Sequence, residues 1–269
     1  MTTLEVQTDQ GDTVVLDRYG SGPAVVFIAG AGPYREIDGA TTQTAQALAD
    51  RGFTTTVHDR VGRGDSAATG DVTLERELAA VAAVVDAAGG GPAVLVGHSS
   101  GCSIALAAAA RGVPTAGLVL WEAPLDEQSD LDSVRSWLAD VTDRLDAGDL
   151  AGATAEYVRD MPAEFREGLA HMPFHARFVA QAPAYRADGE SLVWAASGPL
   201  GELLGRDVPV LALVGEQTFP GMPEAAARIA REVPGAVSEV LAGAWHSWDV
   251  PAAVDRFAAF ARAVQPTRV

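Results

Sequence analysis

Short apolar, β-branched runs alternate along this chain with longer, alanine-rich stretches of helical periodicity. This alternation predicts βαβ units, and therefore an α/β fold with a mostly parallel, eight-stranded sheet flanked by helices. The turn sequence Gln10-Gly11-Asp12 predicts that the first two strands form a hairpin. The expected strands are 3–8, 13–19, 24–28, 53–58, 93–97, 116–121, 208–214 and 237–241. The expected helices are 38–50, 72–87, 100–111, 223–232 and 251–264.

The alternation stops between residues 125 and 204, where strand-like runs vanish and prolines 162, 173 and 183 break helical pieces. An insertion at this point predicts a helical cap over the carboxyl ends of the strands, where open α/β sheets bind their ligands. We therefore expect a core of residues 1–124 and 205–269 and a cap of residues 125–204. Most of the cap's aromatic side chains should form its own core, and a minority, including Phe178, should face a pocket.

The charge balance limits the partners of the chain. A formal net charge of -17 argues against a nucleic-acid or anionic-membrane partner, because both need a positive surface. A single cysteine, Cys102, excludes an internal disulfide. The first residues do not resemble a signal peptide and no apolar run reaches membrane-spanning length, so we expect a cytoplasmic protein.

Missing residue types exclude several cofactors. The 19 basic residues are all arginine, which excludes a lysine Schiff base and a P-loop ending in Gly-Lys. No GxGxxG follows the early strands, so a dinucleotide site is not expected. We predict a protein that uses no cofactor and no metal.

The motif AVLVGHSSGCS, residues 93–103, carries the strongest chemical signal. It places G-x-S-x-G between a buried-type strand and an alanine-rich helix, the context in which this motif forms a nucleophile elbow. Side chains at Gly97 and Gly101 would clash with neighbouring elements, and the turn lifts the Ser99 hydroxyl above the sheet. The following helix N-terminus favours developing negative charge. A plain glycine-rich turn is the alternative interpretation.

In this context the chain resembles the α/β-hydrolase fold family over nearly its whole length. The segment DRVGRGDS, residues 59–66, resembles the family's glycine-rich loop after the fourth strand. The segment PAVVFIAGAGP, residues 23–33, resembles the strand and loop that supply part of the oxyanion hole. The family commonly has His-Gly where this chain has Ala29-Gly30.

The resemblance implies roles for several backbone groups of these loops. The N–H groups of Ala31 and Ser100 would hold the oxyanion. Gly30 and Gly32 would lie beside the substrate.

A serine hydroxyl needs a base, and five histidines are available. The family places its base between the last strand and the final helix, where this chain has His246 in AGAWHSW. The flanking Trp245 and Trp248 would wall an apolar site or pack against the last helix.

The other histidines fit the role of base less well. His58 ends a strand, and His98 lies inside the elbow. His171 and His175 have i, i+4 spacing, but Pro173 interrupts the helix and no HExxH surrounds them, which argues against a metal site. These two histidines are candidates for the cap wall of the pocket.

The commonest family pattern has an aspartate after the seventh strand, where this chain has Thr218. Glu122, in LVLWEAPL, stands 23 residues after Ser99 at the end of the next strand. A carboxylate leaving a buried strand is costly unless it has a partner. We predict that Glu122 bonds Nδ1 of His246. Glu216, Asp126 or a solvated Glu122 are the alternatives, and Asp249 is too near His246 in sequence.

Some subgroups of the fold, including certain haloalkane dehalogenases and zearalenone lactonases, carry their acid after the sixth strand. The chain is more similar to the lactonases in three features: a Ser-Ser-Gly elbow, a Glu-x-Pro after that strand, and no aspartate after the seventh. The resemblance implies a serine hydrolase with the triad Ser99, His246 and Glu122.

The predicted function is cleavage of a carboxylic ester or lactone of a small to medium, largely apolar substrate through an acyl-enzyme. One alternative is a carbon–carbon bond hydrolase or perhydrolase with the same triad. Another is a non-catalytic, hydrolase-fold ligand-binding protein. The expected partner is a small molecule, and the oligomeric state stays open.

Overall fold

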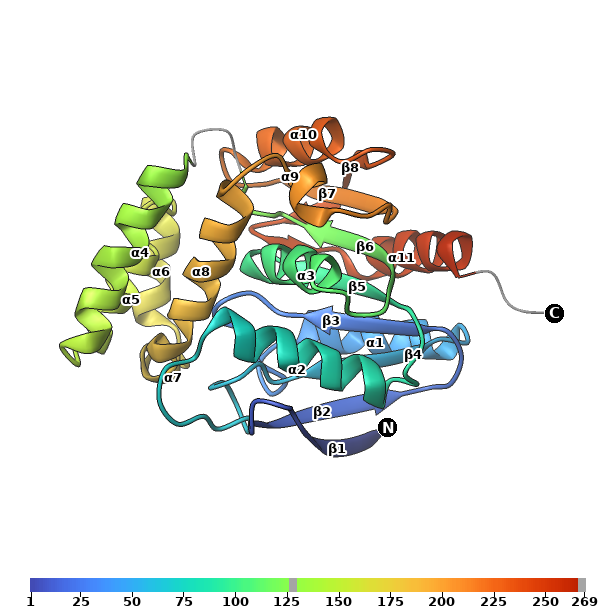
Figure 1. Ribbon diagram of the computed structural model, residues 1–269, viewed down its shortest axis with the longest axis horizontal. Helices are drawn as coiled ribbons and strands as arrows, with labels where there is room; N and C mark the ends of the chain where they lie inside the picture. Colours follow the sequence, from blue (N-terminus) through green and yellow to red (C-terminus); the bar gives the residue numbers. More distant parts are fainter. Residues whose placement is uncertain (126–129, 266–269) are drawn as a thin grey trace.

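The computed structural model describes residues 1–125 and 130–265, which form a sheet with helices on both faces (Figure 1). The described strands follow the order β1-β2-β4-β3-β5-β6-β7-β8-β9 across the sheet. Their bounds are β1 (Thr2–Gln7), β2 (Thr13–Tyr19), β3 (Ala24–Ile28), β4 (Thr54–His58), β5 (Ala93–His98), β6 (Thr115–Trp121), β7 (Val210–Gln217), β8 (Val237–Ala244) and β9 (Ser247–Trp248).

The strand predictions are confirmed, each within three residues. β1 and β2 pair antiparallel as the expected hairpin, with Leu4 opposite Leu16. The strands from β4 to β8 in the sheet order run parallel to one another. The prediction of eight strands is wrong by one, because the two-residue β9 pairs antiparallel with β8. A strand of two residues is too short to show a period in the sequence.

The five predicted helices are confirmed within two residues. They are α1 (Gly39–Asp50), α2 (Leu74–Ala87), α3 (Ser100–Ala110), α10 (Met222–Glu232) and α11 (Val250–Val264). Between β6 and β7 lie α4 (Leu131–Asp146), α5 (Leu150–Tyr157), α6 (Ala163–His171), α7 (His175–Ala180), the 3-10 helix η1 (Ala182–Ala184), α8 (Tyr185–Ala196) and α9 (Leu200–Leu204).

Two apolar cores lie on opposite faces of the sheet. On β5, Leu95 belongs to the core shared with α2, α3 and α8 to α10, whereas Val94 and Val96 belong to the core shared with α1 and α11. This split follows from the two-residue period of a strand. Because both faces are covered, the parallel strands are continuous apolar runs.

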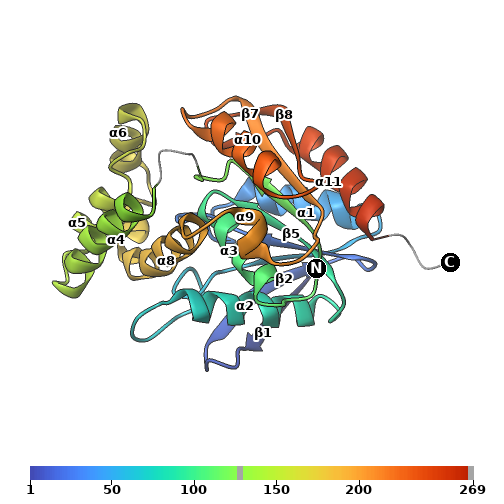
Figure 2. The same cartoon turned by 45° about the horizontal axis from the view of Figure 1, so that its top comes forward.

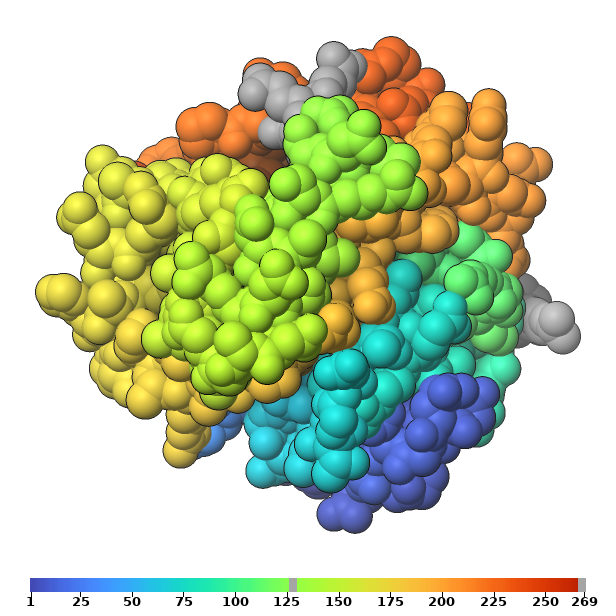
Figure 3. All heavy atoms as spheres, turned by 60° about the vertical axis from the view of Figure 1, so that its left-hand side comes forward, coloured from blue at the N-terminus to red at the C-terminus, as the bar shows by residue number. Residues whose placement is uncertain are grey.

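The helices α4 to α7 enclose a third apolar cluster, which includes Val141, Tyr157 and Phe178. Figures 1 and 2 place α4, α5 and α6 together at one end of the molecule, and Figure 3 shows their atoms, green to yellow, as a continuous lobe. Helix α8 instead packs against both α3 and α4, and its Ala187 and Ala195 belong to the core of the sheet. The division into core and cap stays a prediction.

Within residues 1–125 and 130–265, no helix combines the length and the apolar character needed to cross a bilayer.

Candidate active site

Ser99 lies on a sharp turn between β5 and α3. Its backbone has φ 54° and ψ -127°, a conformation that residues other than glycine rarely adopt. A Cβ on Gly97 would lie 2.6 Å from the Cα of Cys102, so a side chain there is excluded. A Cβ on Gly101 would lie 2.2 Å from the Ile28 carbonyl oxygen. Both glycines of the motif are therefore required for the close packing of strand and helix.

The structure brings Glu122 and His246 into direct contact. Oε2 of Glu122 lies 2.5 Å from Nδ1 of His246, and because a carboxylate only accepts, Nδ1 must donate. The other carboxylate oxygen, Oε1, accepts the N–H of Gly215 at 3.0 Å. Glu122 is 1 % exposed, so this buried carboxylate has the partners that its burial demands.

The surroundings of Glu122 favour its charged form. Burial alone would raise its pKa, but the hydrogen bond with His246 and the nearby Thr218 bring the pKa below its ordinary value. Thr218, at the position where the commonest pattern has an aspartate, thus stands beside the glutamate that contacts the histidine.

The alternative acids lie elsewhere or cannot be placed. Glu216 is an exposed residue of β7. Asp249 is the N-cap of α11, where its side chain accepts the N–H of Ala252 at 3.0 Å. Asp126 lies outside the described residues.

The loop that carries His246 is held in a strained conformation by residues of other strands. Trp245 and His246 have φ values of 54° and 71°. The His246 carbonyl oxygen accepts hydrogen bonds from Nε2 of His98 at 2.8 Å and from Nε1 of Trp121 at 3.3 Å. The ring of Phe219 stacks on the His246 ring, with centroids 5.3 Å apart. These contacts fix both the backbone and the ring of His246.

His98 is suited to this contact because it stays neutral. Burial, followed by the effect of a charge on His246, lowers its pKa to about 3. Its Nε2 hydrogen atom is then directed at the carbonyl oxygen of a residue 148 positions away. No local pattern in the sequence reveals so distant a pairing, so this role of His98 was not predicted.

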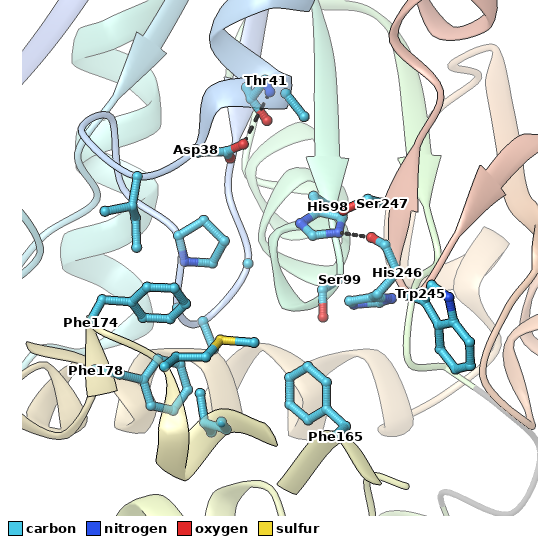
Figure 4. Close-up of a pocket in the computed structure, with 18 of the residues that line it drawn as sticks. Asp38, Thr41, His98, Ser99, Phe165, Phe174, Phe178, Trp245, His246 and Ser247 are labelled. Atoms are coloured by element: carbon cyan, nitrogen blue, oxygen red, sulfur yellow. Dashed lines mark hydrogen bonds between the residues drawn. The ribbon is translucent and has the colours of Figure 1, made fainter. Parts of the chain in front are cut away.

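Ser99 and His246 both line two cavities. Figure 4 shows the Ser99 side chain beside the His246 ring, with His98 drawn above them. Both residues line a cavity of about 340 Å³ and a second cavity of about 480 Å³. A ligand that fills either cavity would therefore lie against Ser99.

The residues predicted to form the oxyanion hole lie near Ser99. A Cβ on Gly30 would lie 3.0 Å from the Ser99 Cβ, so the chain passes directly beside the elbow. The next residue, Ala31, lines the first cavity. Ser100 is the first residue of α3, and its N–H has no acceptor within the helix.

The walls of the first cavity include five of the predicted pocket residues: Gly30, Gly32, Phe178, Trp245 and Trp248. Trp245 is 75 % exposed, whereas Trp248 is buried and packs edge-on against Phe257 of α11. Trp248 therefore fits both predictions made for it: it lines the pocket, and it packs against the last helix.

The predicted cap histidines His171 and His175 line neither cavity; Met172 and Phe174 line the first one instead. α6 ends at His171 and α7 begins at His175, so the two residues do not share a continuous helix face. In the described part of the chain, no group of three or more His, Cys, Asp or Glu side chains is arranged to hold a metal ion.

The fold and the elbow define a recognisable class. A family model described as the alpha/beta hydrolase family matches residues 25–260, and the chain belongs to this family of hydrolytic enzymes. No curated protein matches the chain.

Solved structures support the same fold. An alpha/beta hydrolase from Sphaerobacter thermophilus is 26 % identical, with a TM-score of 0.82 over 96 % of this chain and 99 % of that one. A thermophilic esterase from Thermogutta terrifontis is 21 % identical, with a TM-score of 0.64 over 98 % and 97 % of the two chains. The enol-lactonase from Burkholderia xenovorans is 16 % identical, with a TM-score of 0.66 over 97 % and 98 %.

Proposed function

We propose that the protein is a serine hydrolase that cleaves a carboxylic ester or lactone through an acyl-enzyme. The observation that carries this proposal is the hydrogen bond between Glu122 and His246, on a ring that lies beside Ser99. An ionised carboxylate behind the ring fixes its tautomer, so that Nε2 is free to accept a proton. It also stabilises the imidazolium that forms when the serine is deprotonated.

The same catalytic groups act in both halves of the reaction, the formation of the acyl-enzyme and its hydrolysis. His246 takes the proton of Ser99, whose Oγ attacks the carbonyl carbon, and the N–H groups of Ala31 and Ser100 stabilise the oxyanion. The imidazolium then protonates the leaving alcohol and leaves an acyl-enzyme. Water activated by His246 attacks the acyl group and releases the acid and the free serine.

The two cavities favour an apolar substrate. Their walls are mainly aliphatic and aromatic, and volumes of about 340 and 480 Å³ match those of small-molecule sites. Because Ser99 belongs to both, the substrate would place one portion in each cavity. The neighbours that are an esterase and an enol-lactonase support ester or lactone chemistry. A lactonase of the zearalenone type and a cytoplasmic location remain predictions from sequence.

A fluorophosphonate probe tests the nucleophile. We expect the folded protein to be labelled at Ser99, with labelling abolished in Ser99→Ala, because the probe phosphonylates only an activated serine. Ser103→Ala, on the same helix, is the matched control and should keep its labelling. Intact folded protein that does not react would favour the ligand-binding alternative, and hydrolysis of simple aryl esters would separate ester from carbon–carbon chemistry.

Narrowing one cavity at a time tests the substrate arrangement. Ile37→Trp should fill part of the first cavity and Ala196→Trp part of the second. Each should lower kcat/KM about tenfold for esters that are bulky on one side of the scissile bond, and the two variants should discriminate against opposite sides. A panel of esters with short or long acyl and alcohol portions measures this. Ala139→Trp, at an exposed site on α4, is the control, and identical profiles for both variants would contradict the arrangement.

A further inference from the structure

Four buried charged side chains form a cluster that contacts the loop of residues 29–31, here called the oxyanion loop. Arg60 and Arg63 follow β4, Glu77 comes from α2 and Asp188 from α8; all four side chains are fully buried. Glu77 Oε1 lies 2.8 Å from Arg60 Nη2 and 3.0 Å from Arg63 Nη1. Asp188 Oδ1 lies 2.8 Å from Arg60 Nη1, and its Oδ2 pairs with Arg63.

The cluster is balanced at two positive and two negative charges. Although burial alone would raise the pKa of Asp188, Arg60 and Arg63 hold it below its ordinary value. Removing one of the four charges would leave its partner buried without a counter-charge. A substitution at any of these residues that removes the charge is therefore expected to destabilise the fold.

The arginines also hold the oxyanion loop by its carbonyl groups. Nη1 of Arg60 donates to the carbonyl oxygens of Ala29 at 3.1 Å and Gly30 at 3.2 Å. Nε of Arg63 donates to the carbonyl oxygen of Ala31 at 3.1 Å. In a trans peptide the carbonyl of Gly30 and the N–H of Ala31 point in opposite directions. Arg60 therefore turns the N–H of Ala31 away from the cluster.

The same cluster reaches the second expected oxyanion donor. The hydroxyl of Ser100 donates to Oδ1 of Asp188 at 2.7 Å, the oxygen that also pairs with Arg60. Ser100 is 1 % exposed. Its side chain is thus tied to the cluster, while its N–H lies at the start of α3 next to Ser99.

We propose that Arg60 and Asp188 are positioning residues that set the two oxyanion amides relative to each other. Arg60 orients the amide of Ala31, Asp188 anchors Ser100, and the direct ion pair between them links the two donors. This inference rests on the proposed hydrolase function. Since Asp188 comes from α8, in the segment between β6 and β7, that segment contributes to the chemical step as well as to the cavity walls.

The first test removes one link with the smallest change. Ser100→Ala deletes the hydroxyl that bonds Asp188 but keeps the backbone N–H. In the folded variant we expect kcat to fall about tenfold with KM nearly unchanged, because a misplaced donor affects the transition state and not ground-state binding. Ser103→Ala is the matched control: its buried hydroxyl bonds Ser191 and the Ser100 carbonyl, and kcat should stay within about twofold.

The second test changes the guanidinium. Arg60→Lys keeps the charge but cannot hold both carbonyls and both carboxylates, so we expect a fall in kcat of about 10- to 100-fold. Arg76→Lys is the control, because Arg76, the residue before Glu77 on α2, pairs with the buried Asp12 and makes no hydrogen bond with the oxyanion loop. Asp188→Asn, whose amide oxygen can still accept from Ser100, should retain more activity than Asp188→Ala.

Inhibition by an alkyl trifluoromethyl ketone distinguishes an effect on the position of the oxyanion donors from an effect on the stability of the protein. The Ser99 oxygen adds to its carbonyl carbon, the proton passes to His246, and the former carbonyl oxygen becomes an oxyanion. Its inhibition constant should rise by the same factor as kcat/KM falls in each variant, whereas a competitive apolar alcohol should bind unchanged. Folded Ser100→Ala and Arg60→Lys with wild-type kcat and ketone inhibition would overturn the inference. A wild-type protein that reacts with neither ketone nor fluorophosphonate would instead overturn the proposed function.

Discussion

Glu122→Gln should lower kcat for ester hydrolysis by about 10²–10⁴-fold with the fold intact. Glutamine keeps the shape of the side chain but removes the charge that stabilises the imidazolium of His246. Its amide can also donate to Nδ1, which would favour the wrong tautomer of the ring. Steady-state kinetics on the purified variant, with circular dichroism to verify folding, measure the effect.

Glu216→Gln is the matched control for this experiment. Glu216 is exposed on β7, and its replacement should change kcat by less than about tenfold. If Glu216→Gln proved the more damaging of the two in folded protein, the acid would belong to the seventh strand.

The second large effect concerns stability in acid. His58 is buried and His98 is partly buried, and each has its pKa lowered to about 3. For both, burial is the main cause; the charge of Arg60 adds to it at His58, and a proton on His246 would add to it at His98. These histidines stay neutral in the folded protein at pH values where the unfolded chain, with a pKa near 6.5, takes up protons. The unfolded state therefore gains stability as the pH falls.

The free energy of unfolding should decrease as the pH falls from about 6.5 toward 3, by up to about 1.4 kcal/mol per pH unit for each histidine. The lowered pKa of Glu122 adds a further loss at the acid end, below its ordinary value of 4.5. Urea unfolding between pH 7 and pH 4.5 measures the slope, and His58→Gln should make it shallower by about one proton. Constant stability over this range would contradict the prediction.

The fold was predictable because it follows from local patterns. Apolar runs such as β5 and the Ala-rich helix after it show their period within a few residues, and the elbow is one contiguous motif. The partner of His246 was predictable for another reason. A carboxylate at the end of the buried strand β6 requires a partner, and parallel strands bring their carboxyl ends together.

What the sequence did not reveal depends on contacts between distant segments. The bond from His98 to the His246 carbonyl and the cluster of Arg60, Arg63, Glu77 and Asp188 join elements far apart in the chain. An isolated arginine in a glycine-rich loop gives no sign that it will be fully buried. The bounds of the helices between β6 and β7 were equally hard to predict, because prolines interrupt their periodicity.

The four residues other than glycine with positive φ in the described chain are Ser99, Glu122, Trp245 and His246, all in the candidate site. Each such conformation costs on the order of 1–3 kcal/mol, against a typical total stability of about 5–15 kcal/mol. Glycine would relieve this backbone cost at each of the four positions, but at Glu122 and His246 it would also remove the hydrogen bond between them. A directed-evolution campaign that selects only for heat tolerance would therefore favour loss of Ser99 and of the exposed Trp245, so activity has to be screened in the same round.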